Sequence, residues 1–303
     1  MFDEILDQLR GSQPVTATMA GLISNLSMQR REAGAEEWRR FVQAGVRQHP
    51  MYSMLLEDPM VRHSTERPRG YPGDAELLDY IYGAADITPH IDGASALGRR
   101  LYDFDKNAPG CVAVRNRLQM AAAETDRLAA AGGRPDVLSI ACGHLREAGM
   151  LRSLHNGTMG RLVGVDQDAL SVQHARDEWG HLGVDVQRLD ARMLIHRGLQ
   201  TLGRFDFIYA LGLYDYLSDR AGARLLQTAV DMLKPGGKVW VANFLQDIWV
   251  AGYMEAVMDW WLTYRSEEQM PALMERLDPA KVASYRVFVE PEHNVTFLEV
   301  VRA

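Results

Sequence analysis

The sequence predicts an α/β fold in which a mainly parallel sheet is covered by helices on both faces and is preceded by a helical region. Three observations support it. From Asp136 onward, short apolar runs alternate with helical stretches, as in a buried parallel sheet. Before that point, apolar residues recur at helical spacing. Between the two lies the Gly-Gly-Arg-Pro segment at residues 132–135, which interrupts any helix.

Residues 1–108 are predicted to form a helical cap or lid. Apolar side chains follow a spacing of three and four in residues 2–9 and 38–46, and Pro50 closes the second of these segments. Two prolines and two glycines then force a structured loop at residues 67–73. Asp74 is expected to N-cap the next helix, which should reach Tyr82.

Residues 109–303 are predicted to form the sheet domain, which opens with a long helix after Pro109. A short turn at residues 291–294 joins the last two strands, and this spacing favours a hairpin with an antiparallel final strand. The expected strands lie at residues 137–140, 161–166, 184–189, 205–210, 238–243, 285–289 and 295–301.

The composition bounds the class of protein. Of 303 residues, 47% are apolar and 24% charged, which is ordinary for a protein with a buried core. The net charge of -7 argues against nucleic acid or an anionic membrane as the main partner. The two cysteines, Cys111 and Cys142, form no pattern of a disulfide framework or a metal site. We therefore expect a cytoplasmic protein without a metal, whose partner is a small molecule; a homodimer is left open.

Residues at the carboxyl ends of the first three strands predict a nucleoside site, since doubly wound sheets bind ligands there. Gly143, after the first strand, permits a tight turn and close approach of a ligand. Asp166 ends the second strand, followed by Gln167, and its carboxylate suits a ribose diol. Asp190 and Ala191 follow the third strand, where an acceptor and a backbone amide could hold an adenine edge.

Five motifs resemble, in order and spacing, the class I S-adenosylmethionine-dependent methyltransferases. The resemblance implies a Rossmann-like sheet of seven strands, the last antiparallel, and S-adenosylmethionine as cofactor. It places Gly143 under the methionine part, Asp166 on the ribose and Asp190 at the adenine. The motifs are Val-Leu-Ser-Ile-Ala-Cys-Gly (137–143), Gly-Val-Asp (164–166), Leu-Asp-Ala (189–191), Phe-Asp-Phe-Ile (205–208) and Leu-Lys-Pro-Gly-Gly-Lys (233–238).

One motif departs from the family, which usually has an acidic residue and three glycines around the first turn. This chain has Ser139, Ala141, Gly143 and Leu145 at those places. Leu145 is bulky, so the methionine part is expected to be held in an unusual way. Arg146 either pairs with a carboxylate or is an exposed residue of the first helical turn.

A nicotinamide enzyme is the main rival, because Asp166 would serve that cofactor's ribose equally well. The turn at residues 143–148 lacks the glycine that lets a pyrophosphate lie against the helix start. The terminal hairpin also fits that class poorly. The dehydrogenase interpretation is therefore disfavoured.

Methyl transfer needs an in-line nucleophile and a dry pocket. The segment at residues 212–217 follows the fourth strand, at the mouth of the expected site, and offers Tyr214 and Asp215 for sulfonium contact or proton acceptance. Asp215 could instead cap the following helix. Asn243 ends the fifth strand and faces the same mouth.

The loop at residues 67–74 is interpreted as a lid that places Tyr71 on the sulfonium and Arg69 on a carboxylate; a simple anchoring turn is the alternative. The candidate catalytic residues are thus Tyr71, Tyr214, Asp215 and Asn243. The candidate cofactor-binding residues are Arg69, Tyr71, Ala141, Gly143, Asp166, Gln167, Asp190, Ala191, Gly212 and Tyr214.

Two further features are predicted near this mouth. Residues 260–265 are expected to form a helix across the opening, with aromatic side chains that pack in a core. Arg265 is expected to form an exposed salt bridge rather than to bind a substrate carboxylate. His144 lies in the cofactor turn, where it could equally face solvent.

Three functions remain open on these grounds. The first is methyl transfer to a small polar metabolite. The loops at residues 67–74 and 212–217 resemble a bacterial subgroup of the fold that includes proteins making a hydroxy-fatty-acid methyl ester signal, and this resemblance implies a carboxylate acceptor. The second is intramolecular cyclisation of the cofactor, as in azetidine-2-carboxylate synthases, with release of methylthioadenosine. The third is a non-catalytic S-adenosylmethionine-binding subunit.

Overall fold

The computed structural model describes residues 1–11, 14–189 and 202–303. They divide into two compact units. The first comprises Met1–Arg115 with Asp247–Trp261, and the second comprises Asn116–Gln246 with Leu262–Ala303. The boundary expected at residue 108 lies inside the first unit. The segment 247–261, which the sequence analysis assigned to the sheet domain, belongs to the helical unit.

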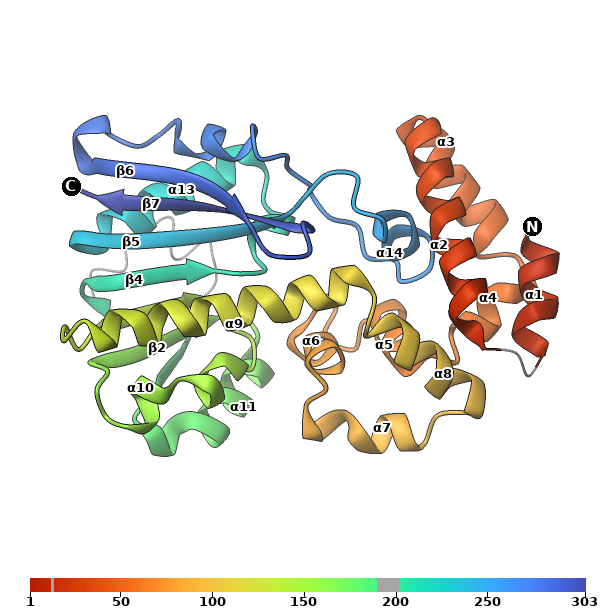
Figure 1. The fold of residues 1–303 in the computed structure, drawn as a ribbon, viewed down its shortest axis with the longest axis horizontal. Coiled ribbons are helices and arrows are strands. Elements are labelled where there is room, and N and C mark those ends of the chain that lie inside the picture. The colour runs from red at the N-terminus through yellow and green to blue at the C-terminus, as the bar shows by residue number, and fades with distance from the viewer. Residues whose placement is uncertain (12–13, 190–201) are drawn as a thin grey trace. The chain divides into compact units, whose positions relative to one another are not determined.

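The first unit is helical throughout its described part, as predicted (Figure 1). Helix α3 continues into a π-helix, Phe41–Val46. The helices are α1 (Phe2–Arg10), α2 (Val15–Glu32), α3 (Ala35–Arg40), α4 (Pro50–Leu55), α5 (Pro59–Glu66), α6 (Ala75–Tyr82), α7 (Thr88–Asp92), α8 (Ala96–Asp105) and α14 (Ala251–Ala256).

Local signals in the sequence set the ends of several of these helices. The carboxylate of Asp74 accepts a hydrogen bond from the backbone amide of Leu77 at 2.8 Å, which confirms the predicted N-cap of α6. That helix ends before Gly83, whose φ of 68° is left-handed. Pro50 begins α4, where its missing N–H costs no helical hydrogen bond. The preceding helical segment ends before it, at Val46.

Helix α14 is held in the first unit by buried polar contacts and close packing. The carboxylate of Glu255 accepts a hydrogen bond from the indole of Trp38 at 2.7 Å and pairs with Arg30 at 2.9 Å. A Cβ on Gly252 would lie 2.6 Å from the carbonyl oxygen of Leu26, so only glycine allows this approach to α2. These contacts join the segment to helices far away in the sequence.

The second unit contains a seven-stranded sheet of order β3-β2-β1-β4-β5-β7-β6. Strands β1 to β5 run parallel, β7 is antiparallel to β5, and β6 is antiparallel to β7, which confirms the predicted fold and terminal hairpin. The strands are β1 (Asp136–Ile140), β2 (Arg161–Asp166), β3 (Asp185–Arg188), β4 (Phe205–Ala210), β5 (Leu233–Phe244), β6 (Val282–Val289) and β7 (Val295–Arg302).

Helices cover both faces of this sheet. Helix α9 (Pro109–Ala130) crosses one face and α13 (Asp219–Asp231) lies on the other (Figure 1). The connections also include α10 (Arg152–His155) and α11 (Ala169–Trp179). Phe205 and Ile208 of β4 and Leu226 of α13 are fully buried between sheet and helix. Burial of each such side chain contributes about 1.5–3 kcal/mol. No helix of the described residues is long and apolar enough to cross a membrane.

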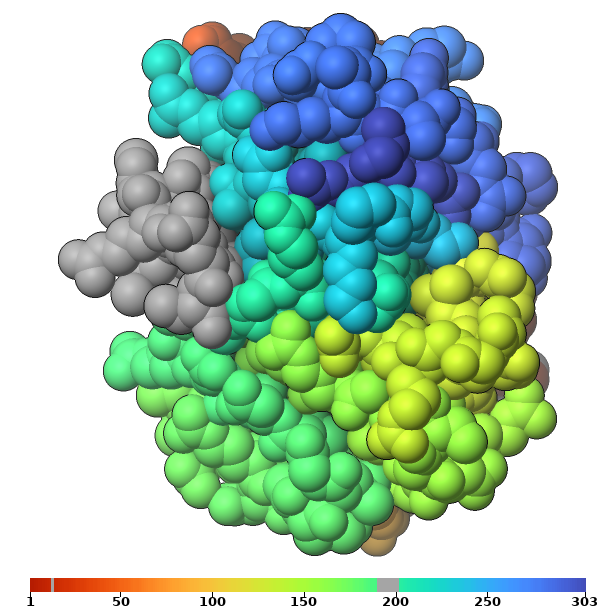
Figure 2. Space-filling model, turned by 90° about the vertical axis from the view of Figure 1, so that its left-hand side faces the viewer, coloured from red at the N-terminus to blue at the C-terminus, as the bar shows by residue number. Residues whose placement is uncertain are grey.

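The strand order reverses between β1 and β4, because the chain proceeds to β2 on one side and to β5 on the other. A ligand crevice is expected at the carboxyl ends of the strands at this point. Figure 2 shows the opposite edge of the sheet, where the parallel strands begin. The last residues of β7 lie at this edge, where Val301 pairs with Lys238 of β5. The candidate site is therefore expected in the loops that follow β1, β2 and β4.

Residues 260–265 contradict the sequence prediction, since they form no helix. Their backbone amides are bonded to other elements instead. The amide of Thr263 donates to the carbonyl of Asp215 at 2.7 Å, and that of Arg265 donates to the carbonyl of Phe244 at 3.1 Å. The aromatic pattern resembled a helix face, but these long-range bonds hold the segment in an irregular conformation. Trp260 is buried, as expected for a packing aromatic.

Candidate functional site

The turn after β1 has an unusual backbone. Ala141, Gly143 and Leu145 all have left-handed φ values, at 55°, 54° and 52°. These are the positions at which the resembled family has its three glycines. Ala141 and Leu145 therefore adopt the left-handed conformation that is easy for glycine, although each carries a Cβ atom, at a cost of about 1 kcal/mol each. Strain of this kind is retained where the surrounding structure requires the shape.

Leu145 helps to hold this turn in place. Its side chain is fully buried, and its Cδ2 atom lies 3.5 Å from the position of a Cβ on Gly164 in β2. The same Cβ would lie 2.9 Å from the sulfur of Cys142, so glycine at 164 leaves room for the turn. The bulky side chain at position 145 thus packs against the sheet.

Asp166, at the end of β2, is bonded to this turn. One carboxylate oxygen accepts from the amide of Gly143 at 2.8 Å, and the other accepts from the amide of Asp168 at 2.9 Å. The side chain is buried, and this burial raises the pKa of Asp166 although both amides oppose the shift. The structure therefore brings Asp166 and Gly143 together at the carboxyl edge, next to Ala141.

A second buried acid, Glu147, lies beneath the turn. Its carboxylate accepts from the hydroxyl of Tyr209 at 2.8 Å and from that of Ser139 at 3.2 Å. Ser139 and Tyr209 are register partners on β1 and β4, the strands that flank the reversal of strand order. Burial raises the pKa of Glu147. The family that the sequence resembles usually has an acidic residue at the position of Ser139. In this chain the carboxyl group of Glu147 lies next to Ser139 instead.

Tyr214, after β4, lies within the apolar core. It is 1% exposed, and its hydroxyl donates to the carbonyl of Gly222 in α13 at 3.3 Å. Burial raises the pKa of this phenol strongly. Contact of Tyr214 with a sulfonium stays a prediction, and this placement favours a packing role for the ring.

Asp215 joins the loop after β4 to the end of β5. Its carboxylate accepts from the amide of Phe244 at 2.7 Å. Burial raises the pKa of Asp215 to about 6, against the opposing effects of Arg117 and Arg265. The alternative that Asp215 caps α13 is wrong, because the hydroxyl of Ser218 accepts from Ala221 at that helix start.

Asn243 is fully buried and takes part in a polar cluster built around Arg265. The guanidinium of Arg265 donates to the side-chain oxygen of Asn243, to the carbonyl of Tyr214 at 2.9 Å and to that of Leu217 at 2.7 Å. Arg265 does form a salt bridge, with Asp219, but the prediction that this arginine is exposed is wrong. Arg265 is 3% exposed, and only Asp219 lies at the surface. The cluster fixes the loop after β4 against β5.

Arg117, on α9, reaches the same loop. The guanidinium lies 5.8 Å from the ring centroid of Phe244 and 3.8 Å from the carboxylate of Asp215. A Cβ on Gly212 would lie 3.2 Å from its Nη2 atom, so the lack of a side chain at 212 leaves room for this approach. The loop that the sequence placed at the mouth of the site therefore has a buried cation above it.

The remaining candidates are not brought together in the described part of the second unit. Arg69 and Tyr71 belong to the first unit, where Arg69 pairs with Glu76 at 3.5 Å, so their lid role stays a prediction. Gln167 is exposed, and its carbonyl accepts from Arg188. Asp190 and Ala191 lie outside the described residues.

Solved structures align with this chain to different extents. A possible exported protein from Bordetella parapertussis aligns over 84% of this chain and 97% of its own, with 19% identity and a TM-score of 0.56. The magnesium protoporphyrin IX methyltransferase from Synechocystis PCC 6803, solved with bound S-adenosylhomocysteine, aligns over 74% and 97%, with 13% identity and a TM-score of 0.48. The N-methyltransferase NodS from Bradyrhizobium japonicum WM9, also with S-adenosylhomocysteine, aligns over 61% and 86%, with 16% identity and a TM-score of 0.42.

Among curated proteins, no significant match to the sequence is found. Residues 137–237 match the family model described as a methyltransferase domain. The match spans β1 to the start of β5, and thus both sides of the reversal in strand order. Within these residues the chain is similar to a methyltransferase domain.

Sequence reasoning missed the buried positions of three side chains of the second unit. Arg117 was hidden in a long helix, where a single arginine is most often exposed. Glu147 was overlooked because its partners Ser139 and Tyr209 come from separate strands. Arg265 was named but given an exposed role. The only signal in the sequence that could have predicted their burial is that an apolar residue adjoins each of these charged residues.

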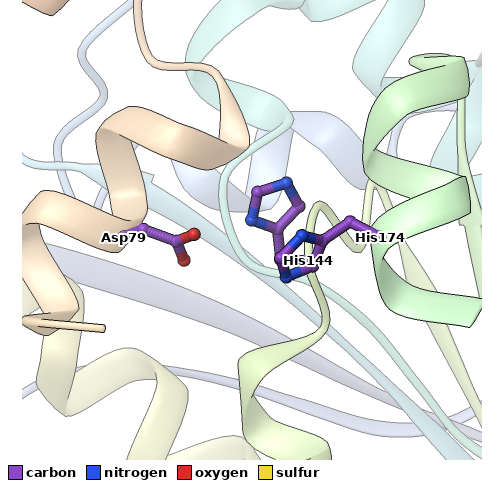
Figure 3. Close-up of side chains that lie close together, drawn as sticks. All are labelled: Asp79, His144 and His174. Carbon is purple, nitrogen blue, oxygen red and sulfur yellow. The ribbon is translucent and has the colours of Figure 1, made fainter. Parts of the chain in front are cut away.

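Two histidines stack beside the turn after β1. Figure 3 shows His144, from the turn after β1, and His174, from α11; their ring centroids are 3.8 Å apart. His144 is 4% exposed, so the alternative of a solvent-facing ring is wrong. Burial, His144 and Arg146 lower the pKa of His174. Arg146 pairs with Glu178 at 2.6 Å and its side chain is only 13% exposed, so the alternative of an exposed residue is wrong.

Proposed function

We propose that this protein is an S-adenosylmethionine-dependent methyltransferase that acts on a small polar metabolite bearing a carboxylate. The observation that carries the proposal is the bond between Asp166 and Gly143 at the carboxyl edge of a methyltransferase domain. It joins an acid suited to a ribose diol to the turn expected under the methionine part.

The chemistry of the residues present fits this cofactor. A carboxylate has about four lone-pair sites, so Asp166 keeps acceptor capacity for a hydroxyl beside its bonds to backbone amides. Glu147 adds a buried carboxyl group at the reversal of strand order, which could accept a hydrogen bond from the ammonium end of the methionine part. Bound S-adenosylmethionine supplies an electrophilic methyl group, which a nucleophile takes as the sulfonium becomes a thioether.

In this proposal the protein acts mainly by positioning. The Arg265 cluster holds the loop after β4 in one conformation and fixes the side chains of Asn243 and Asp215 at the end of β5. With a pKa of about 6, Asp215 is also suited to accept a proton near neutral pH. Arg69 and Tyr71 are proposed to close the site from the helical unit and to exclude water.

The proposed acceptor is a small molecule and the proposed location is the cytoplasm. Both rest on the charge of -7 and on the absence of a cysteine framework in the sequence. A carboxylate acceptor is supported by the resemblance of residues 67–74 and 212–217 to the subgroup described above.

The test is to incubate the purified protein with S-adenosylmethionine, first alone and then with a cell extract, and to identify products by mass. S-adenosylhomocysteine that forms only with extract is the expected result, and the extract component that gains the mass of a methyl group is the acceptor. Methylthioadenosine formed without extract would show cyclisation instead. Binding without turnover in any extract would indicate a non-catalytic subunit.

A further inference from the structure

Arg117 is a buried cation whose hydrogen-bonding capacity is not used. The residue is 3% exposed, yet its Nε and Nη1 atoms have no hydrogen-bond partner among the residues that the structure describes. Buried polar groups are satisfied in the great majority of cases, and an unsatisfied charged group is especially costly. A buried arginine with unsatisfied donors indicates a hydrogen-bond partner that is present only when a ligand is bound.

Asp215 does not fill this role. The gap of 3.8 Å between its carboxylate and Nη1 of Arg117 is too long for a hydrogen bond. The other oxygen of Asp215 is bonded to the amide of Phe244. The two charges therefore attract each other, while Nε and Nη1 of the guanidinium have no hydrogen-bond partner among the described residues.

The surroundings pack against the guanidinium without a hydrogen bond to its Nε or Nη1 atom. Phe244 lies on one side as a cation–π partner, at 5.8 Å, and the backbone of Gly212 lies on another. Both residues stand at the carboxyl ends of β5 and β4, where ligands of such sheets bind. A fixed guanidinium with open donors matches a carboxylate, which it can bind through two parallel hydrogen bonds.

We propose that Arg117 binds a carboxylate of the bound ligands, an inference that rests on the proposed methyltransferase function. The carboxylate has two possible sources. One is the methionine end of S-adenosylmethionine, and the other is the methyl acceptor. In either case Arg117 is a binding residue that holds an anionic group next to Gly212 and Phe244.

Calorimetry on the full-length protein distinguishes the sources. The variants are Arg117→Met, Arg117→Lys and, as a control on the same helix, Arg127→Met, whose side chain is 60% exposed. The probes are S-adenosylhomocysteine, methylthioadenosine, which lacks the amino-acid end, and hexanoate with hexanamide on protein saturated with S-adenosylhomocysteine. Thermal melting of each variant without ligand verifies folding, and Arg117→Lys serves if Arg117→Met does not fold.

If the cofactor is the source, Arg117→Met weakens S-adenosylhomocysteine binding by about 10- to 100-fold, the range for a charged hydrogen bond, and leaves methylthioadenosine unchanged. If the acceptor is the source, S-adenosylhomocysteine binding is unchanged, wild type prefers hexanoate to hexanamide, and the variant loses that preference. Arg127→Met should match wild type throughout.

The inference is overturned if Arg117→Met and Arg117→Lys bind S-adenosylhomocysteine as wild type does and no preference for hexanoate depends on Arg117. A wild-type protein that fails to bind S-adenosylhomocysteine and methylthioadenosine would instead overturn the proposed function itself.

Discussion

The carboxylate of Asp166 accepts a hydrogen bond from the backbone amide of Gly143 at 2.8 Å. This contact ties the end of β2 to the left-handed turn after β1, and so links two positions that are 23 residues apart in the sequence. The acid therefore has a structural task as well as the proposed ribose contact. A test of its ligand role must separate the two.

We expect Asp166→Ala to weaken S-adenosylhomocysteine binding by about 1–3 kcal/mol, because a charge-assisted contact to the ribose is lost. Asp185→Ala, which removes an exposed acid of the neighbouring strand β3, should leave affinity unchanged. Calorimetry measures both, and urea unfolding reports the separate cost of losing the bond to Gly143. A folded Asp166→Ala protein with wild-type affinity would reject the ribose assignment.

The left-handed turn predicts a pair of substitutions with opposite signs. Ala141 is exposed with a φ of 55°, so Ala141→Gly relieves strain without loss of packing and should raise the free energy of unfolding by about 0.5–1 kcal/mol. Gly143→Ala adds a Cβ at a φ of 54° and should lower it by a similar amount. Urea denaturation decides, and two changes of the same sign would contradict the assigned backbone.

Arg265 is expected to be critical for the loop after β4. Arg265→Ala should lower the free energy of unfolding by about 3–5 kcal/mol, because Asn243 and the carbonyls of Tyr214 and Leu217 lose a buried donor. Asp219→Ala removes its exposed ionic partner, whose side chain is 76% accessible, and should cost less than about 1 kcal/mol. Equal losses in guanidinium unfolding would mean that the surface pair carries the stability.

The first unit contains a buried acid pair that should make stability fall as pH rises. Burial raises the pKa of Asp105 to about 6, and burial together with Asp105 raises that of Asp58. In the unfolded chain both groups lose their protons near pH 4. Between about pH 4 and 6 the folded state therefore binds more protons, and stability declines across that window.

Asp58→Asn should reduce this decline, since asparagine keeps the N-cap of α5 and carries no charge. Asp103→Asn, which changes a 73% exposed acid on α8, should keep the wild-type slope. The free energy of unfolding in urea at several pH values gives the slopes. An unchanged slope in Asp58→Asn would exclude the pair as its source.

The sheet was predictable because its information is local. Apolar runs mark β1, β2 and β4 at nearly the observed bounds, and the short turn at residues 291–294 is sufficient to predict the final hairpin. The acid at the end of β2 and the glycine after β1 follow from the same strand ends. Asp74 was found for a similar reason, because a cap acts within one helical turn.

The missing parts depend on contacts that no local pattern encodes. Ala141 and Leu145 take a conformation that sequence alone assigns to glycine, and only the packing of the turn on Gly164 explains it. The irregular course of residues 260–265 follows from bonds to Asp215 and Phe244. The burial of Arg117 likewise requires knowledge of which loops meet α9.

The division of the chain has a consequence for experiments on the separate parts. Residues 247–261 complete the helical unit, although they lie between two strands of the sheet, and Glu255 joins them to Arg30 and Trp38. A truncated protein that begins at residue 109 would leave this inserted piece with its apolar side uncovered and Glu255 unpaired. Excision of the N-terminal helices should therefore yield an aggregating fragment rather than a minimal catalytic core.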